Sequence, residues 1–340
     1  MEIHRILFPE ANRAELITET MPDVPGPGQV LYRTSYTTVS PGTERANITG
    51  DPNVAGVNAP SVKFPRGMGY SSSGVVQATG EGVTSVRPGD RVIGYWSKHA
   101  DFNMLDQHQI VKITDERIGM REAAAVFIST FPMTAIRKTR LEAGESLLVM
   151  GLGLLGQFAV RLARAAGAVP VIAVDPVRSR REDALRGGAD EALDPFEPGF
   201  AQRVKDLTCG GVNAAIEVTG QGAGLDETLD CMAKFGRVAL LGCTRNKEFT
   251  IDYYRKVHCP GITLIGAHTA ARPIAESHPG CFTHNDDIKA VMKLCAGGRI
   301  DITSMLSELH VPSDCPKVYH RLIYDRDFPM AVQFDWTGEL

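Results

Sequence analysis

The first 208 residues contain no cysteine, because all seven cysteines of the chain lie at or beyond Cys209. No two of them are spaced as Cys-x-x-Cys. An odd and scattered set of cysteines favours buried thiols over a disulfide framework or a zinc ribbon. The N-terminal part of the chain therefore offers no thiolate to a metal ion.

Long apolar runs are also missing. Runs such as Ser146–Val149 and Val169–Val174 are far shorter than the roughly 20 residues that span a bilayer. The N-terminal sequence MEIHRILFPE carries charge where a secretory signal has an apolar core. We therefore expect a cytoplasmic protein with no membrane segment.

Neither sign of charge is in clear excess. The 36 basic and 40 acidic side chains leave a net charge of -4, which is too small and of the wrong sign for binding nucleic acid or an anionic membrane. We expect a small-molecule substrate. A chain of 340 residues exceeds one typical hydrophobic core, so two domains are expected.

The N-terminal third combines short apolar runs with turn signals at Pro25–Gly28, Ser40–Glu44 and Pro88–Val92. Short strands that are closely punctuated by glycine and proline predict an antiparallel, barrel-like β region. From Arg121 the sequence becomes typical of helix, with an interruption expected near Pro132.

Strands and helices then alternate along the chain. Repeated βαβ units with right-handed crossovers predict a parallel sheet covered on both faces, which is a doubly wound domain. The expected strands are Ser146–Met150, Pro170–Val174, Ala214–Val218, Gly236–Leu241 and Ile262–Gly266, and the expected helices are Leu155–Ala166, Arg178–Gly187 and Gly224–Ala233. A helix at Asp286–Ala296 and short apolar strands near the C-terminus should follow.

A G-x-G-x-x-G pattern at Gly151, Gly153 and Gly156 joins the first of these strands to its helix. The first glycine permits the tight turn, the second lets backbone amides approach a pyrophosphate, and the third lets the helix pack close to the sheet. The amides at Leu154 and Leu155 and the positive end of the helix dipole would then face the phosphates. The pattern predicts a dinucleotide site.

Asp175 ends the second strand of this region. It follows Gly156 by about the 20 residues that place a carboxylate against the adenosine ribose. An acid there accepts hydrogen bonds from both ribose hydroxyls and repels a 2′-phosphate, which predicts NAD. Arg178, Arg180 and Arg181 leave NADP as the alternative, since they would clamp a 2′-phosphate if Asp175 turned away.

Further motifs accompany the glycine loop: PGTE at Pro41–Glu44, GMGYSSSGVV at Gly67–Val76, PGDRV at Pro88–Val92, EVTG at Glu217–Gly220 and VALLG at Val238–Gly242. With them the whole chain resembles the medium-chain dehydrogenase/reductase family of the zinc alcohol dehydrogenase type. The resemblance implies an α/β protein with two domains. A GroES-like, β-rich catalytic domain would comprise 1–122 and 267–340, and a Rossmann dinucleotide-binding domain would comprise 123–266.

Zinc members of this family hold a catalytic zinc at three places, where this sequence has Pro41, the pair Tyr70 and Ser71, and Thr130. Proline has no ligating side chain, and neutral hydroxyls are poor zinc ligands. The family's structural zinc lobe needs four cysteines in the part of the chain that has none. We therefore expect no zinc. No recognisable ligand spacing joins the other candidates, which are Glu44, His99, Asp101 and His108.

Without zinc, another group must stabilise the developing alkoxide or enolate. The resemblance places Thr43 at the family's relay hydroxyl and Tyr70 at the position of a histidine ligand, where its phenol would donate a hydrogen bond or shuttle a proton. An unperturbed phenol has a pKa of about 10, so that role requires a nearby cation. The alternative is that Tyr70 only fills the vacated cavity.

Other residues are expected to contact the cofactor and the substrate. Thr219, Gly242 and Cys243 follow the carboxyl ends of their strands, where cofactors lie in open α/β sheets, so we expect them along the nicotinamide half. Candidate substrate contacts are Glu44, whose alternative is an ion pair with Arg45, together with Thr130, His268, Arg272 and the stretch His278–Asp287.

The expected activity is hydride transfer between NAD(H) and a secondary alcohol or ketone, without zinc, on a polyol, a sugar or another hydroxylated metabolite. One alternative is an NADPH-dependent quinone or enoyl reductase, which Asp175 disfavours. The other is a non-catalytic dinucleotide-binding sensor, which the loss of metal ligands favours. The resemblance also implies a homodimer paired through the strand Ile262–Gly266, unless that strand is covered within one chain.

Overall fold

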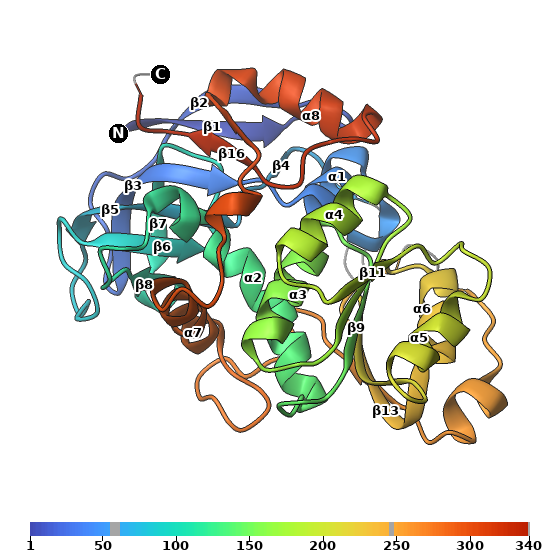
Figure 1. Cartoon of the computed structure of the whole chain (residues 1–340). Helices are drawn as coiled ribbons and strands as arrows, with labels where there is room; N and C mark the ends of the chain where they lie inside the picture. The colour runs from blue at the N-terminus through green and yellow to red at the C-terminus, as the bar shows by residue number, and fades with distance from the viewer. Residues whose placement is uncertain (55–61, 245–247, 339–340) are drawn as a thin grey trace. The chain divides into compact units, whose positions relative to one another are not determined.

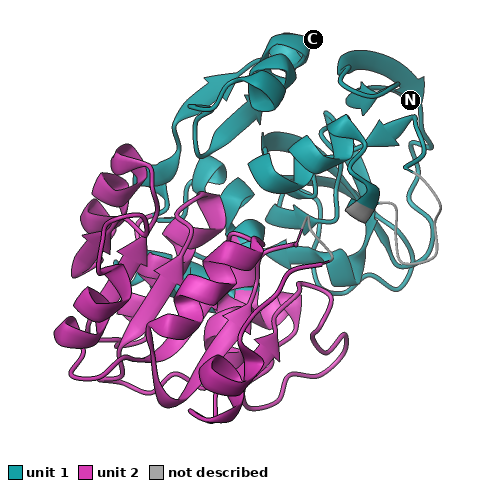
Figure 2. Cartoon of the chain, turned by 90° about the vertical axis from the view of Figure 1, so that its right-hand side faces the viewer, with its two compact units in different colours: residues 1–128, 288–298, 302–340 teal, residues 129–287, 299–301 magenta. Residues whose placement is uncertain are grey.

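The computed structural model of the chain describes residues 1–54, 62–244 and 248–338. The chain forms two compact units, which Figure 2 shows in separate colours. One unit comprises Met1–Ile128, Ile288–Gly298 and Ile302–Leu340, and the other comprises Ser129–Asp287 and Arg299–Asp301. The domain limits expected from the sequence stay a prediction, because compactness alone does not show which segments fold together.

The first unit is β-rich. Its strands are β1 (Glu2–Phe8), β2 (Glu15–Thr20), β3 (Gln29–Thr38), β4 (Arg66–Gly67), β5 (Ser71–Thr79), β6 (Arg91–Tyr95), β7 (Phe102–Asp106), β8 (Ile110–Lys112), β15 (Glu308–His310) and β16 (Val332–Asp335) (Figure 1). They form a sheet of order β2-β1-β4 and a larger one of order β15-β16-β3-β5-β6-β8, to which β7 is added by pairing with β3. Apart from β15 with β16, the neighbouring strands are antiparallel, which confirms the β region expected from the sequence.

Helices α1 (Pro41–Thr49) and α8 (Cys315–Tyr324) pack together in this unit. The apolar cluster around them includes Phe8, Ile48, Tyr319 and Trp336, none more than 1% exposed. The turn predicted at Ser40–Glu44 is wrong, because α1 begins there. Proline suits the first position of a helix because that position needs no N–H donor, so the same letters begin α1.

Helix α2 (Met120–Thr139) runs through Pro132, where an interruption had been expected. Proline removes one hydrogen bond and destabilises a helix by about 3 kcal/mol. The preceding turn contains Val126, Phe127 and Ile128, all 0% exposed. Each such apolar side chain contributes roughly 1.5–3 kcal/mol on burial, so packing outweighs the loss at proline.

The second unit contains one parallel sheet of order β11-β10-β9-β12-β13-β14, as the βαβ pattern predicted. Its strands are β9 (Leu147–Met150), β10 (Val171–Val174), β11 (Glu191–Leu193), β12 (Val212–Glu217), β13 (Met232–Leu240) and β14 (Thr263–Gly266). Its helices are α3 (Leu154–Ala165), α4 (Arg178–Arg186), α5 (Phe200–Leu207) and α6 (Gly222–Asp230). Strand β11 and helix α5 were not anticipated from the sequence.

Shorter helical segments and one longer helix complete the described chain. Helix α7 (His284–Ala296) matches the helix expected at Asp286–Ala296 within two residues. The short segments are η1 (Pro52–Val54), η2 (Gln107–Gln109), η3 (Tyr254–His258), η4 (Thr303–Met305) and η5 (Pro312–Asp314). Within the ranges that the structure describes, no helix combines the length and apolar character needed to span a bilayer.

Candidate active site

Four neighbouring strands of the parallel sheet end level with one another. Across β10, β9, β12 and β13 the register aligns Val174, Met150, Glu217 and Leu240. The segments that follow these residues therefore leave the sheet along one edge. In open parallel sheets this carboxyl edge is where ligands bind.

The glycine loop between β9 and α3 leaves almost no space for side chains at two of its three glycines. Gly151 has a φ of 97°, and a Cβ there would lie 2.9 Å from Cγ2 of Thr219. A Cβ on Gly156 would lie 1.9 Å from the carbonyl oxygen of Gly151, so a side chain would push α3 away from the loop. Gly153 precedes α3 and a Cβ there would meet nothing within 4 Å, so this side of the loop is open.

The start of α3 provides hydrogen-bond donors at this edge. Leu154 and Leu155 are its first two residues, and the first amides of a helix have no acceptor within the helix. These amides and the positive end of the dipole form the kind of site that binds a pyrophosphate. The loop and helix thus fit a dinucleotide.

Asp175 lies directly after β10 and is 4% exposed. Its Oδ2 accepts the amide of Leu152 at 2.8 Å and its Oδ1 accepts the amide of Val177 at 2.8 Å. A carboxylate offers about four acceptor positions, so it can accept further donors such as ribose hydroxyls. The two backbone bonds hold the carboxylate at the loop.

The three arginines that follow Asp175 differ in their contacts. Nη1 of Arg180 lies 3.6 Å from Oδ2 of Asp175, and the Arg180 side chain is 37% exposed. Arg181 donates to the carbonyl of Asp175 at 2.7 Å and pairs with Asp194 at 3.0 Å. Arg178 forms an exposed ion pair on its own helix. Of the three, Arg180 is the one whose partly exposed guanidinium lies beside the Asp175 carboxylate.

The segments after β12 and β13 pack backbone against backbone. Glu217 is 3% exposed, accepts the amides of Thr219 at 2.7 Å and Gly220 at 3.1 Å, and also accepts the Thr219 hydroxyl. Burial raises the pKa of Glu217, although these donors oppose the shift. A Cβ on Gly242 would lie 2.3 Å from the Gly220 nitrogen, and one on Gly220 would lie 2.3 Å from the carbonyl oxygen of Cys243. Thr219, Gly242 and Cys243 therefore share one rigid turn region.

Tyr70 lies in an aromatic cluster of the first unit. Its ring centroid is 5.6 Å from that of Trp96 and 5.8 Å from that of Phe127, and the residue is 7% exposed. Trp96 is 42% exposed and has a φ of 57°. The hydroxyl of the neighbouring Ser71 donates to the carbonyl of Ala124 at 2.6 Å.

Thr43 stands in the first turn of α1 and is half-buried. Its carbonyl accepts the amide of the Asn47 side chain at 2.8 Å. Among the residues that the structure describes, the Thr43 hydroxyl has no hydrogen-bond partner, so it can bind a ligand.

Glu44 lies in the same turn but is fully buried. Its carboxylate accepts the amide of Ser40 at 2.9 Å and the Tyr319 hydroxyl at 2.5 Å, and it lies 3.2 Å from Nε2 of His99. Nδ1 of His99 is 2.6 Å from the Thr37 hydroxyl. Burial and the Glu44 carboxylate raise the pKa of Tyr319 well above its ordinary value. These contacts favour a role for Glu44 in fixing the start of α1 over substrate contact.

Thr130 joins a buried cluster within the second unit. Its hydroxyl lies 3.4 Å from Nδ1 of His284, and its carbonyl accepts Nη2 of Arg272 at 2.9 Å. Asp287 is fully buried and pairs with Arg272 at 3.2 Å and with Arg137 at 2.7 Å. Burial and the charge of Arg272 lower the pKa of His284 to about 3, so its imidazole is neutral at pH 7.

His268 does not belong to this cluster in the described contacts. It is exposed, and its Nδ1 accepts the amide of Ala270 at 3.2 Å. This bond makes His268 a cap of its own turn. The stretch His278–Asp287 had been expected near the substrate, and it is His284 and Asp287 from this stretch that gather with Thr130.

Sequence reasoning missed two polar residues of α3. Gln157 is 0% exposed and Arg161 is 7% exposed. Their spacing of four residues on a helix that is otherwise largely apolar was the available signal, because such residues share one face.

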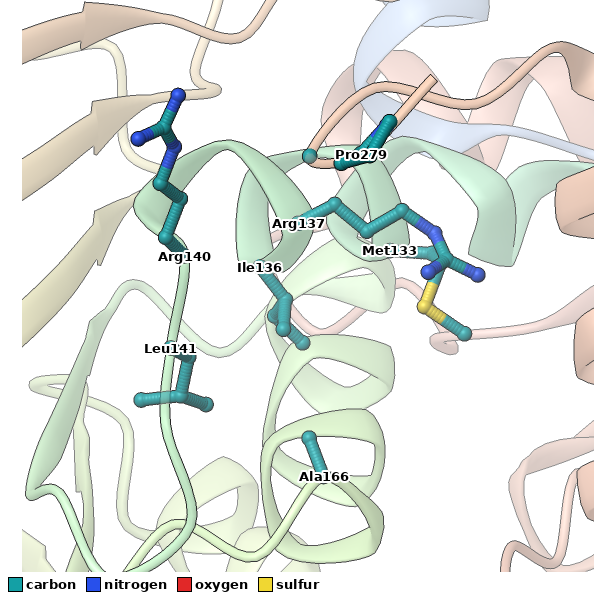
Figure 3. Close-up of a pocket in the computed structure, with 8 residues that line it drawn as sticks. Met133, Ile136, Arg137, Arg140, Leu141, Ala166 and Pro279 are labelled. Carbon is teal, nitrogen blue, oxygen red and sulfur yellow. The ribbon is translucent and has the colours of Figure 1, made fainter. Parts of the chain in front are cut away.

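A cavity of about 610 Å³ lies at the C-terminal end of α2 (Figure 3). Ile136, Leu141 and Ala166 contribute apolar surface, and Arg137 and Arg140 carry the charges. Pro279 and Gly280, from the stretch His278–Asp287 expected near the substrate, also line it, whereas none of the residues expected to bind the cofactor does. The cavity and the proposed cofactor site therefore have no residue in common.

Two family models match the chain, and together they span most of residues 26–279. One is described as the alcohol dehydrogenase GroES-like domain and matches residues 26–135, and the other is described as zinc-binding dehydrogenase and matches residues 155–279. The chain belongs to the zinc-type medium-chain alcohol dehydrogenase family. Family membership makes it an oxidoreductase.

Three proteins that are similar to the chain share less than a third of its residues in the matched regions. An L-threonine 3-dehydrogenase of Pyrococcus horikoshii is 28% identical over 281 residues, which cover 74% of this chain and 79% of that protein. A D-guloside 3-dehydrogenase of Escherichia coli is 27% identical over 209 residues, which cover 61% and 59%. The crystal structure of benzyl alcohol dehydrogenase from Acinetobacter calcoaceticus matches with a TM-score of 0.84 at 19% identity, covering 98% and 99%. This last match shows a shared fold.

The residues present do not fit the zinc that the family description implies. Pro41 begins α1, Ser71 already donates to a backbone carbonyl, and Thr130 lies beside a cationic arginine. In the described ranges, no three side chains of His, Cys, Asp or Glu gather as a metal site. Zinc prefers thiolate, imidazole and carboxylate ligands, so we derive no chemical step through zinc.

Proposed function

We propose that the chain is a zinc-independent dehydrogenase, which transfers a hydride between NAD(H) and a secondary alcohol or ketone. The observation that carries the proposal is the position of Asp175, a buried carboxylate held at the carboxyl edge by two backbone amides. The names of the relatives, which refer to threonine and to a guloside, support a hydroxylated substrate such as a polyol or a sugar.

The geometry of the carboxyl edge supports the following assignment of cofactor-binding residues. Gly151, Gly153 and Gly156, with the amides of Leu154 and Leu155, would hold the pyrophosphate, and Asp175 would hold the adenosine ribose. Thr219, Gly242 and Cys243 would line the nicotinamide half. When bound, the nicotinamide supplies the carbon that accepts or donates the hydride. Arg180 favours NADP as the second candidate, because it is the accessible cation beside Asp175.

The substrate oxygen would be bound by side-chain hydroxyls. Thr43 would relay a proton between the substrate oxygen and solvent, its hydroxyl releasing one proton as it accepts another, and Tyr70 would donate a hydrogen bond to the oxygen on which negative charge develops. A hydrogen bond that strengthens as this charge develops lowers the barrier to hydride transfer. Thr130 would contact the substrate, with His284 neutral beside it and Arg272 as the nearest cation of that cluster. The contacts of Glu44 and His268 do not favour assigning them to the substrate.

We also propose a homodimer. Strand β14 is an edge of the parallel sheet, and Leu264 on it is 37% exposed. An apolar edge strand is a template for pairing with a second copy. Light scattering of the purified chain should give twice the mass of one chain, and Leu264→Lys should give the mass of one. A single-chain mass for the unsubstituted protein would contradict the dimer.

The activity is tested with purified protein of measured metal content. We expect NAD⁺ reduction with at least one member of a panel of polyols, glycosides and other secondary alcohols, and the same rate after dialysis against a chelator. Activity that is lost with the chelator and restored by Zn²⁺ would overturn the zinc-independent proposal. Reduction of enones or quinones with NADPH would replace it by the reductase alternative, and NADH binding without hydride transfer to any compound would favour a sensor.

A further inference from the structure

Gln157 lies one turn into α3, and each polar atom of its buried side chain is hydrogen-bonded. Its Nε2 donates to the carbonyl of Arg180 at 2.8 Å and to the carbonyl of Leu152 at 3.4 Å. Its Oε1 accepts Nη1 of Arg161 at 3.1 Å. An amide with both donors and an acceptor engaged cannot flip without losing bonds. The orientation of this side chain is therefore fixed.

The two carbonyls that Gln157 holds belong to the two segments around Asp175. The amide of Leu152 binds Oδ2 of Asp175 at 2.8 Å, and the guanidinium of Arg180 lies 3.6 Å from the same oxygen. Leu152 is thus held through its nitrogen by Asp175 and through its oxygen by Gln157. The backbone of Arg180 is held at the first turn of α4 while its side chain stays accessible.

Arg161 supports this arrangement from the next turn of α3. Its Nη1 also donates to the carbonyl of Gln157 at 3.2 Å, and its Nε donates to the carbonyl of Asp301 at 3.2 Å. Burial lowers the pKa of the Arg161 guanidinium, which nevertheless stays charged. A Cβ on Gly187 would lie 2.4 Å from Nη1 of Arg161, so a side chain where α4 ends would displace the guanidinium. Helix α4 therefore contacts α3 through Gln157 at its start and through Arg161 at its end.

We propose that Gln157, oriented by Arg161, is a positioning residue for cofactor discrimination. By fixing the first turn of α4, it keeps Asp175 rather than Arg180 opposite the 2′ position of the adenosine ribose. The inference rests on the proposed NAD-dependent function, because it concerns the same edge of the sheet. It adds a residue that contacts neither the cofactor nor the substrate.

Loss of the Gln157 side-chain donors should weaken NADH binding more than NADPH binding. Without the Gln157 donors, the first turn of α4 and the Leu152 peptide each lose one of the bonds that locate them around Asp175. A bound NADH then loses aligned hydrogen bonds to its ribose hydroxyls. A bound NADPH loses less, because its 2′-phosphate attracts Arg180 in whichever position the turn adopts.

The test uses two variants of the full chain and one matched control. Gln157→Met keeps the length of the side chain without hydrogen bonds, and Gln157→Glu keeps the acceptor for Arg161 but loses both donors. The control is Gln202→Met, because Gln202 also bonds a residue four positions on, Asp206 at 2.8 Å, but is exposed on α5. Calorimetric titration gives the Kd for NADH and for NADPH, and thermal unfolding gives stability.

We expect the ratio of the NADPH Kd to the NADH Kd to fall by about tenfold in both Gln157 variants, which corresponds to one to two lost hydrogen bonds. The control should keep the ratio of the unsubstituted chain. Equal weakening of both cofactors, or a lower unfolding midpoint with an unchanged ratio, would show a merely structural role and overturn the inference. If the unsubstituted chain binds neither dinucleotide, the proposed function fails instead.

Discussion

The carboxyl edge of the parallel sheet and the first turn of α1 are two candidate ligand-binding regions, one in each compact unit, and they are built differently. At the sheet edge the ligand groups are backbone amides, and side chains are excluded at Gly151 and Gly156 by contacts under 3 Å. The proposed ligand group at α1 is the hydroxyl of Thr43, and the proposed ligand group in the aromatic cluster of Trp96 and Phe127 is the hydroxyl of Tyr70. A site made of backbone amides depends on the spacing of the glycines in the sequence. A site made of side chains depends on the identity of each residue. Substitutions in the two regions should therefore differ in their effects on stability, cofactor affinity and turnover.

The largest effect is expected at Gly156. Gly156→Ala places a methyl group 1.9 Å from the Gly151 carbonyl, so the unfolding free energy should fall by about 3 kcal/mol and NADH binding should be lost. Urea unfolding and a calorimetric titration measure the two quantities. Gly153→Ala is the counterpart, because its methyl group has space: it should keep the stability and lose only affinity. A Gly156→Ala protein that is as stable as the unsubstituted chain would show that the loop is not rigid.

The next effect is expected at Tyr70. Tyr70→Phe should lower kcat by about 100-fold, because it removes the hydrogen bond to the oxygen on which negative charge develops. The Kd for NADH should not change. The control is Tyr95→Phe in the same aromatic cluster, where the hydroxyl donates to the carbonyl of His108 at 2.6 Å. Turnover that survives Tyr70→Phe would leave this residue as a filler of the cavity.

A smaller change in affinity is expected at Asp175. Asp175→Asn removes the charge that repels a 2′-phosphate and weakens the bonds to the ribose, so NADH binding should weaken by about tenfold and NADPH binding should strengthen. Arg180→Met should weaken NADPH binding and spare NADH. Fluorescence titration with both cofactors measures the four values. If Asp175→Asn leaves the preference unchanged, the ribose contact is made elsewhere.

The smallest effect is a pH dependence of stability. The pKa of His284 is about 3 in the folded chain and about 6.5 in an unfolded one, so between these values the unfolded state binds the extra proton. The free energy of unfolding should therefore fall as the pH drops from 6.5, and His284→Asn should remove about one proton from this dependence. Urea unfolding at pH 7, 6 and 5 provides the slopes. Equal slopes for both proteins would place His284 in a solvated environment.

The parallel sheet and its ligand edge were predictable because their signals are local. An apolar strand, three glycines at fixed offsets and an acid about 20 residues later each constrain the backbone directly. Helix α1 was missed, since proline and glycine at Pro41 and Gly42 are as common in turns as at the start of a helix. The uninterrupted α2 was missed because burial, which depends on the rest of the fold, decides whether a helix passes through Pro132.

The cluster around Thr130 was less predictable, because its residues come from distant parts of the chain. Thr130 is more than 130 residues away from both Arg272 and Asp287 along the chain, yet its carbonyl accepts a hydrogen bond from Arg272. No spacing rule joins them. Glu44 looked like a candidate for the substrate, and only the fold shows that Tyr319, far along the chain, binds its carboxylate.

The central claim is that the sheet edge is built for NAD(H), with Asp175 as the selecting group. Titration of the unsubstituted chain with NADH and with NADPH under the same conditions tests it most directly. The account predicts that NADH binds at least about tenfold more tightly, as expected for a carboxylate that accepts the ribose hydroxyls and repels a 2′-phosphate. Tighter binding of NADPH, or binding of neither cofactor, would contradict it.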